Sequence, residues 1–175
     1  LAIVLLDGWL YVWHRLNHTI PWLWRFHRMH HADRDMDVTT AVRFHIGELS
    51  MSAIARLALI PAMGVTSPQI VFHETLVVAA TMFHHANISI GRFDRWMALG
   101  FITPFLHKVH HSREPIETNS NYSVVFSLWD RLGGTLRQRD ECRSLTLGLN
   151  EFDDPQWETV AGLMTIPMAQ APSRR

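Results

Sequence analysis

Cysteine is almost absent from this sequence, in which Cys142 is the single cysteine among 175 residues. An internal disulfide and a zinc site built from thiolates are therefore both excluded. Any bound metal must be held by imidazole or carboxylate groups. One unpaired thiol also fits a reducing compartment.

The chain also lacks an excess of charge of either sign, because 16 Lys and Arg residues face 16 Asp and Glu residues. Long-range electrostatic attraction to nucleic acid needs a net positive charge or a basic cluster. We therefore expect no nucleic acid partner.

A third absence is a clean run of about 20 apolar residues, the length that spans a bilayer alone. The apolar residues gather instead in four shorter stretches, Leu1–Trp13, Met51–Val65, Gln69–Phe83 and Trp96–Leu106. Gly64, Ser67 and Pro68 separate the second stretch from the third, which predicts a helical hairpin that enters a membrane and returns. Two core helices of a soluble bundle are the alternative. Tryptophans at 9, 13, 22 and 24 favour the membrane, since indole rings gather at the head-group layer.

The ends of the chain differ from its middle. It opens on an apolar run with no basic region before it and no cleavage site, so we expect the natural chain to begin further upstream. From Arg137 onward charged residues and prolines become frequent. We expect residues 1–136 to form one catalytic domain and residues 137–175 to form a polar, solvated C-terminal extension.

Histidine is the abundant residue, with 12 copies against 2 tyrosines. Eight of them form three short motifs, His14-x3-His18, His27-x2-His30-His31 and His107-x2-His110-His111. Residues three and four apart project from the same face of a helix, so each motif can direct its imidazoles at one point. Eight imidazoles exceed the four to six positions around one first-row ion. The spacing therefore predicts two transition-metal ions.

The type of ligand limits the choice of metal ion but does not identify the ion. Neutral imidazole suits Fe, Zn and Cu and is a poor ligand for Mg or Ca. Many imidazoles without a carboxylate pair, in an apolar scaffold, favour oxygen chemistry on lipid over hydrolysis.

Segments between the motifs extend the pattern from Asp7 to Thr135. Arg43-Phe-His-Ile-Gly-Glu48, Phe83-His-His-Ala-Asn-Ile88, Asn121-Tyr-Ser and Leu128-Trp-Asp-Arg-Leu-Gly-Gly-Thr135 accompany the histidines. In this order the set resembles the fatty acid hydroxylase and sterol desaturase superfamily. Ile46, Ser123 and Gly133 depart from that pattern, which usually has proline, glycine and phenylalanine there. None of the departures is a histidine, so we interpret them as subfamily variation.

The resemblance implies an all-α, integral membrane helical protein whose cytosolic helical cap holds a histidine-rich dimetal centre facing the cytoplasm. It implies a di-iron oxygenase, isolable with zinc, that hydroxylates or desaturates a lipid C–H bond using O2. The external electron donor would be a ferredoxin-like or cytochrome b5-like protein. The metal ligands that it implies are His14, His18, His27, His30, His31, His85, His107, His110 and His111.

A tenth ligand must come from elsewhere in the chain, because some relatives have His-x3-His where this chain has Thr81 before His85. His45 is the first candidate and His84 the second, while His73 beside Glu74 is expected not to be a ligand. Six polar residues could orient ligands or cap helices instead: Asp7, Asp37, Glu48, Asn87, Asn121 and Asp130.

Two other functions use the same residues. A zinc-dependent membrane hydrolase would need an acidic base beside the metal, and the sequence has no His-Glu-x-x-His motif because position 77 is Val77. A non-enzymatic metal- or haem-binding membrane protein is the other alternative, although haem needs only one or two axial histidines.

Overall fold

The computed structural model describes residues 1–139 and 145–170, and this part of the chain is helical without a named strand. The all-α prediction is confirmed for it. Its α-helices are α1 (Ala2–Thr19), α2 (Pro21–His31), α3 (Ile46–Ala62), α4 (Ser67–His85), α5 (Phe93–Met97), α6 (Pro104–His110), α7 (Pro115–Thr118), α8 (Leu128–Leu132) and α9 (Val160–Thr165). Short 3-10 turns are η1 (Thr40–Val42), η2 (Asn150–Phe152), η3 (Pro155–Glu158) and η4 (Ile166–Met168).

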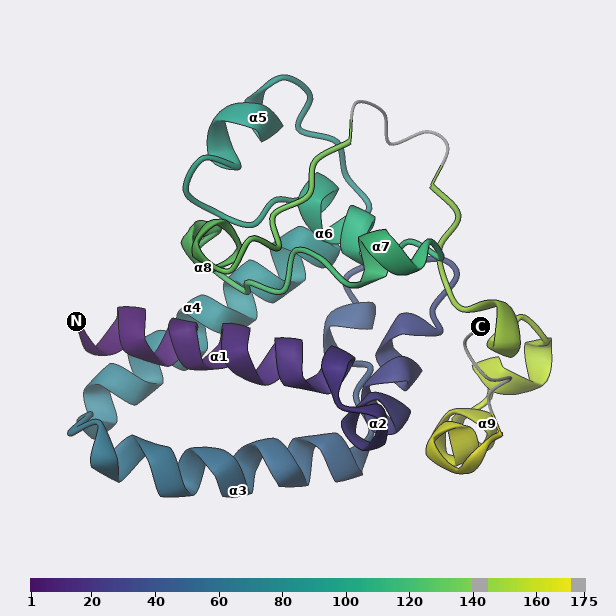
Figure 1. Cartoon of the computed structure of the whole chain (residues 1–175), viewed down its shortest axis with the longest axis horizontal. Coiled ribbons are helices and arrows are strands. Elements are labelled where there is room, and N and C mark those ends of the chain that lie inside the picture. Colours follow the sequence, from purple (N-terminus) through teal and green to yellow (C-terminus); the bar gives the residue numbers. More distant parts are fainter. Residues whose placement is uncertain (140–144, 171–175) are drawn as a thin grey trace.

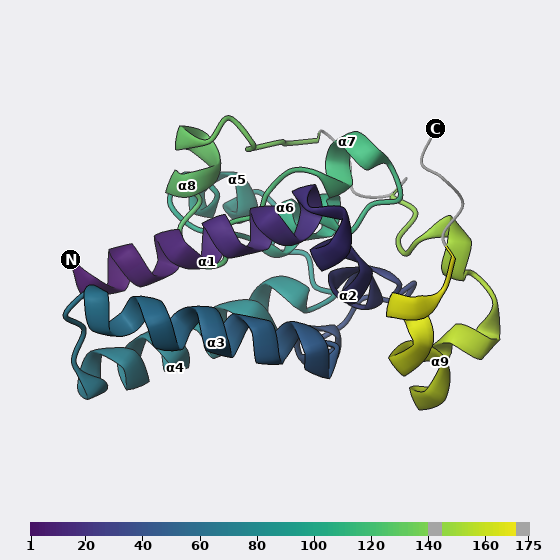
Figure 2. The ribbon, with the colours of Figure 1, turned by 60° about the horizontal axis from the view of Figure 1, so that its bottom comes forward.

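The long helices α1 and α3 run along the long axis of the molecule, and the third long helix, α4, runs obliquely to them (Figure 1). The N-terminus and the turn between α3 and α4 lie together at one end of the molecule in both ribbon views (Figure 2). Away from that end, α1 leads into α2, and α4 ends beside α6. The three histidine motifs lie in this region, on α1, on α2 and at α6.

The predicted hairpin forms, with helices over 46–62 and 67–85. Gly64 has a φ of 63°, a left-handed conformation that glycine adopts without a steric penalty. Thr66 and Gln69 then form a capping box, and Pro68 occupies the first turn of α4, where its missing N–H costs nothing. An ion pair between Arg56 and Glu74 joins the two helices midway.

Within the described part of the chain, no helix is both long enough and apolar enough to cross a bilayer. The integral membrane location therefore stays a prediction. Large apolar side chains nevertheless face outward from both arms of the hairpin, among them Ile54, Leu57, Val71 and Phe72, each more than 60% exposed.

Two buried carboxylates attach the loop that follows α7 to α1 and to α8. Asp7 of α1 accepts hydrogen bonds from the backbone N–H groups of Val125 and Phe126 and from the indole of Trp129. Asp130 accepts from the backbone of Tyr122 and Ser123. Fully bonded carboxylates of this kind fix a loop precisely, because a buried charge is costly without its partners.

Residues 145–170 pack against α2. Trp24, Met29 and Ala32 of the α2 region form one apolar cluster with Leu149, Phe152 and Ile166. Arg28, which is 2% exposed, donates to the carbonyl oxygens of Ile166 and Ala169. A few apolar side chains of the expected polar extension thus cover α2. The domain boundary at 136/137 stays a prediction, and Cys142 lies outside the described residues.

Candidate metal centre

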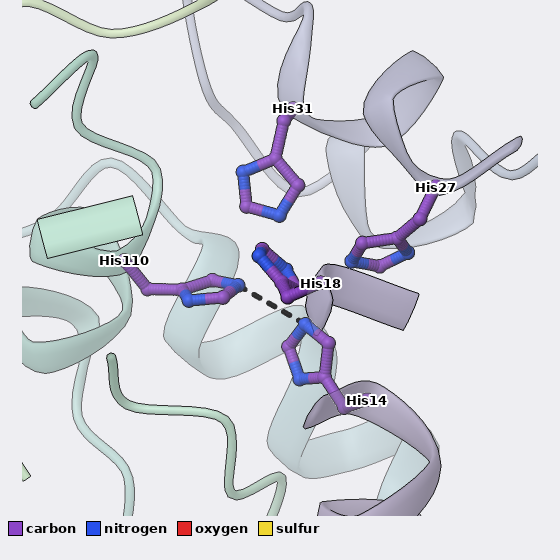
Figure 3. A group of neighbouring side chains, drawn as sticks. All are labelled: His14, His18, His27, His31 and His110. Atoms are coloured by element: carbon purple, nitrogen blue, oxygen red, sulfur yellow. Dashed lines mark hydrogen bonds between the residues drawn. The ribbon is translucent and has the colours of Figure 1, made fainter. Parts of the chain in front are cut away.

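Five histidines from three helices converge on one point (Figure 3). They are His14 and His18 of α1, His27 and His31 of α2, and His110 of α6. One ring nitrogen of each lies within 4.8 Å of one from every other member. His14 is half-buried and the other four are buried. We call these five residues group A.

Four further histidines form a second group with equally short distances between their ring nitrogens. They are His30, His85, His107 and His111, from α2, from α4 and from the C-terminal end of α6, and their ring nitrogens also lie within 4.8 Å of one another. We call them group B. The groups adjoin, since the rings of His31 and His111 stack with centroids 4.4 Å apart. All nine histidines carried over from the resemblance are thus brought together, in two sets.

Hydrogen bonds on the outer side of the rings set their orientation. The Nδ1 of His14 lies 2.7 Å from the carbonyl oxygen of Tyr122, and the Nδ1 of His110 lies 2.6 Å from that of Ser120. The Nδ1 of His85 lies 2.8 Å from the carbonyl oxygen of Thr81. A carbonyl oxygen can only accept, so Nδ1 carries the proton in each case. The Nε2 lone pair is therefore left facing the centre, as in metal-bound histidines.

Glu48 of α3 has the same role through a carboxylate. Its Oε1 lies 2.8 Å from the Nδ1 of His27, and both side chains are buried. Carboxylate–histidine pairs of this kind raise the basicity of a ligating imidazole. Among the six polar residues considered from the sequence, the described contacts place Glu48 directly on a ligand.

The remaining candidates act elsewhere. Asp7 and Asp130 bind backbone N–H groups as described above, and Asp130 thereby positions the Tyr122 carbonyl that holds His14. Asn121 bridges Leu106 and Arg137. Asp37 bonds Thr39, and Asn87 accepts from Lys108. The backbone carbonyls of Thr81, Ser120 and Tyr122 could not be identified from sequence, because every residue has one.

Burial sets the protonation of these rings. It lowers the pKa of His18, His30, His31, His107, His110 and His111 well below the ordinary value for histidine, and neighbouring imidazoles lower it further. Burial likewise lowers the pKa of His85 to about 4, although the bond to Thr81 opposes this. At neutral pH these imidazoles are uncharged, which is the form that binds metal.

Many of the buried ring nitrogens have no hydrogen-bond partner among the described residues. In group A these include both nitrogens of His18 and His31 and the Nε2 of His27; in group B they include Nδ1 of His30, His107 and His111. Unpaired polar atoms at this depth are rare in folded proteins because each costs free energy. Their concentration here fits a site whose remaining partners are metal ions.

The two candidates for a tenth ligand lie in different places. His45 is in neither group: its Nδ1 accepts from the backbone N–H of Gly47 at the start of α3, and its Nε2 lies 3.3 Å from the carbonyl oxygen of Met164. His84 is also in neither group, but it is buried beside group B, with its ring centroid 4.0 Å from that of His107. Neither nitrogen of His84 has a partner among the described residues. His73 lies 3.2 Å from the Glu74 carboxylate and is in neither group.

A cavity of about 270 Å³ opens onto both groups. Its walls come from α1, α3 and α4 and are largely apolar, and histidines of both groups line it together with His84. Leu10, Trp13, Leu49, Val77 and Val78 form much of the apolar surface. The space is suited to an apolar chain held against the histidines.

A comparison with protein families agrees with this geometry. The model of the fatty acid hydroxylase family matches residues 1–135, which include every histidine of groups A and B. This chain belongs to the fatty acid hydroxylase family. The resemblance seen in the sequence motifs is therefore confirmed, and the matched region ends before residues 145–170, which cover α2.

Individual fatty acid hydroxylase relatives are named as lipid hydroxylases and monooxygenases. Ornithine lipid hydroxylase OlsE of Rhizobium tropici is 32% identical over 152 residues, covering 85% of this chain and 44% of the relative. Human alkylglycerol monooxygenase is 27% identical, covering 87% and 34%. Rat cholesterol 25-hydroxylase is 26% identical, covering 85% and 49%. The chain spans about half the length of these relatives or less, and no solved structure matches it.

Proposed function

We propose that this chain is the catalytic part of a membrane-bound di-iron oxygenase that hydroxylates a C–H bond of a lipid. The observation that carries the proposal is the pair of adjoining histidine groups at one end of an apolar cavity. The reaction inserts one oxygen atom of O2 into the C–H bond. The other oxygen atom leaves as water, with two electrons and two protons from a donor.

Group A would hold one iron and group B the other. When bound, the iron pair supplies the activation of O2 that protein side chains cannot perform. The donor set fits iron, because imidazole is a common ligand for it and the uncharged rings present lone pairs at neutral pH. Zinc would fit the same ligands on isolation.

His84 is our proposal for the tenth ligand, in group B, in preference to His45. Two buried ring nitrogens without partners, next to His85 and His107, are what a ligand shows before its metal is bound. The imidazole of His45 already caps α3. His45 would instead support the C-terminal segment through Met164.

The other residues of the site orient the imidazoles and exclude water. Glu48 and the carbonyls of Thr81, Ser120 and Tyr122 hold protons on Nδ1 so that Nε2 stays available. The apolar walls keep water from the reacting carbon, which protects a strong oxidant from side reactions. None of the histidines needs to act as a base.

Three properties support a lipid substrate and a membrane location. The relatives carry names of enzymes that act on lipids. The cavity is apolar, and the α3–α4 hairpin exposes apolar side chains that would contact lipid. We place the metal centre at the cytoplasmic face, where a ferredoxin-like or cytochrome b5-like protein could supply electrons. Hydroxylation is preferred to desaturation because the relatives are named hydroxylases and monooxygenases.

The test is lipid mass spectrometry of cells that express the full-length gene, compared with cells that express the His110→Ala variant. A gain of one oxygen atom in a lipid species, present with the wild type and absent with the variant, is the expected result. A loss of two hydrogens would assign desaturation instead. An unchanged lipidome with an iron-loaded protein would refute lipid oxidation, and a stable zinc-only protein active on esters would favour hydrolysis.

A further inference from the structure

One charged pair interrupts the apolar surface of the α3–α4 hairpin. The guanidinium of Arg56 donates to both carboxylate oxygens of Glu74, one bond measuring 3.3 Å. The same carboxylate lies 3.2 Å from the Nδ1 of buried His73. The two side chains are 25% and 37% exposed, and an ion pair that water reaches contributes little to stability. Joining two helices therefore does not by itself explain why charge is placed here.

Arg56 lines the cavity that opens onto the two histidine groups. The cavity-lining residues of α3 are Glu48, Leu49, Ser52 and Arg56, which follow one helix face away from His27. Eight residues separate Glu48 from Arg56, and a rise of 1.5 Å per residue makes that about 12 Å along the helix. Arg56 thus stands at the end of the cavity remote from the histidines.

We propose that Arg56 is a specificity-determining residue that binds an uncharged oxygen of the lipid substrate, such as an ester or amide carbonyl or a hydroxyl. The proposal rests on the proposed function, because it names a feature of the lipid substrate that binds at that site. A guanidinium offers five N–H donors, and the bonds to Glu74 engage two nitrogens. The donors not engaged by Glu74 are suited to an acceptor inside the cavity.

The charge of the pair determines which oxygen is accepted. Arg56 is neutralised by Glu74, so a carboxylate or phosphate entering beside it would leave an uncompensated negative charge in apolar surroundings. An uncharged carbonyl or hydroxyl oxygen avoids that cost. The carbon to be oxidised then lies further along the cavity, toward the histidines, within an otherwise apolar lipid chain.

Binding of two matched probes tests this without turnover. Radiolabelled methyl palmitate and hexadecane are bound to the iron-loaded full chain in detergent micelles, with protein-free micelles as background. We expect methyl palmitate to bind about tenfold more tightly than hexadecane, as one hydrogen bond to a charged donor would give. The double variant Arg56→Leu with Glu74→Leu should bring that ratio close to one at unchanged iron content. Arg25→Leu, an exposed arginine outside the cavity, should keep the ratio.

A second variant keeps the proposal testable if the double variant does not fold. Glu74→Gln leaves Arg56 unneutralised and should make the chain prefer palmitate to methyl palmitate. A wild-type ratio near one, a ratio preserved in the double variant, or no gain for palmitate in Glu74→Gln would each overturn the role of Arg56. A preserved preference in a chain that produces no oxidised lipid would instead overturn the proposed function alone.

Discussion

At the scale of single residues, the centre depends on which nitrogen of each imidazole carries the proton. The carbonyl oxygens of Tyr122, Ser120 and Thr81 fix this for three rings, and Glu48 fixes it for His27. These contacts act on the metal through the ligand and not by touching it. Their removal should therefore weaken metal binding while leaving every histidine in place.

Glu48→Leu is the clearest case. We expect iron affinity to fall by about 10- to 100-fold, because the His27 ring loses its hydrogen-bond acceptor. Competition with a chelator of known affinity measures this. Glu114→Leu, at an exposed position, is the control and should not change the affinity. An unchanged affinity in Glu48→Leu would show that the carboxylate is not needed to orient the ring.

The tenth ligand can be decided by comparing two alanine variants. His84→Ala should lower the bound iron, because group B would lose a donor. His45→Ala should keep the iron content and lower the melting temperature, because the cap of α3 and the contact with Met164 would be lost. Elemental analysis of both variants supplies the measurement. Loss of iron in His45→Ala alone would reverse the assignment.

The sequence predicted which histidines would come together but not which groups orient them. The nine histidines of groups A and B were visible because their 3- and 4-residue spacing is local to one helix. The backbone carbonyl oxygens that accept from the imidazoles were not visible in the sequence, because most of these contacts join segments that are far apart in the chain. One departure from the family pattern also has a local explanation: a side chain at Gly133 would collide with the hydroxyl of Tyr11, which bonds Thr135.

At the scale of helices, α2 is the element on which the centre depends most, because it supplies ligands to both groups. Its outer side is covered by residues 145–170. Arg28 lies between His27 and His30 in the sequence and donates to two carbonyls of that segment, with its guanidinium 5.0 Å from the Phe152 ring. The segment beyond the family match therefore packs on the helix that carries histidines of both groups.

Arg28→Leu should destabilise the fold by about 3 kcal/mol, because two buried carbonyls lose charge-assisted hydrogen bonds. We expect the free energy of unfolding to fall and iron to be released at lower chelator concentration. Arg25→Leu, exposed on the same helix, should change neither. Equal stability of the two variants would mean that residues 145–170 do not support α2.

The long helices could be predicted from sequence and the short ones could not. Apolar stretches with Gly64 and Pro68 between them located α3 and α4 within a few residues of their observed bounds. Helices α5, α7 and α8 span only four or five residues and are held by tertiary contacts such as those of Asp130. The packing of Ile166 on Trp24 joins residues more than 140 positions apart, and no local pattern encodes it.

At the scale of the whole molecule, burying so many imidazoles makes stability depend on pH. Their pKa values are lowered mainly by burial, so the unfolded chain binds protons below about pH 6.5 that the folded chain does not. The metal-free protein should therefore lose stability as pH falls from 6.5 toward about 4, the pKa of His85. Each imidazole contributes up to about 1.4 kcal/mol per pH unit.

Chemical denaturation of the metal-free protein at pH 7.5, 6.5 and 5.5 measures this. The expected result is a modest fall in the free energy of unfolding between the first two values, where unfolded histidines begin to bind protons, and a steeper fall between the second and the third. Iron-loaded protein should release its metal over the same interval, since protons compete for the same nitrogens. A stability independent of pH would mean that the rings are more hydrated than the structure shows.

The central claim is that two histidine groups hold two metal ions side by side, and diffraction at the iron absorption edge tests it most directly. The account predicts two anomalous peaks in crystals of the iron-loaded chain. One should lie among His14, His18, His27, His31 and His110, and the other among His30, His85, His107 and His111. A single peak, or iron bound away from both groups, would contradict the account.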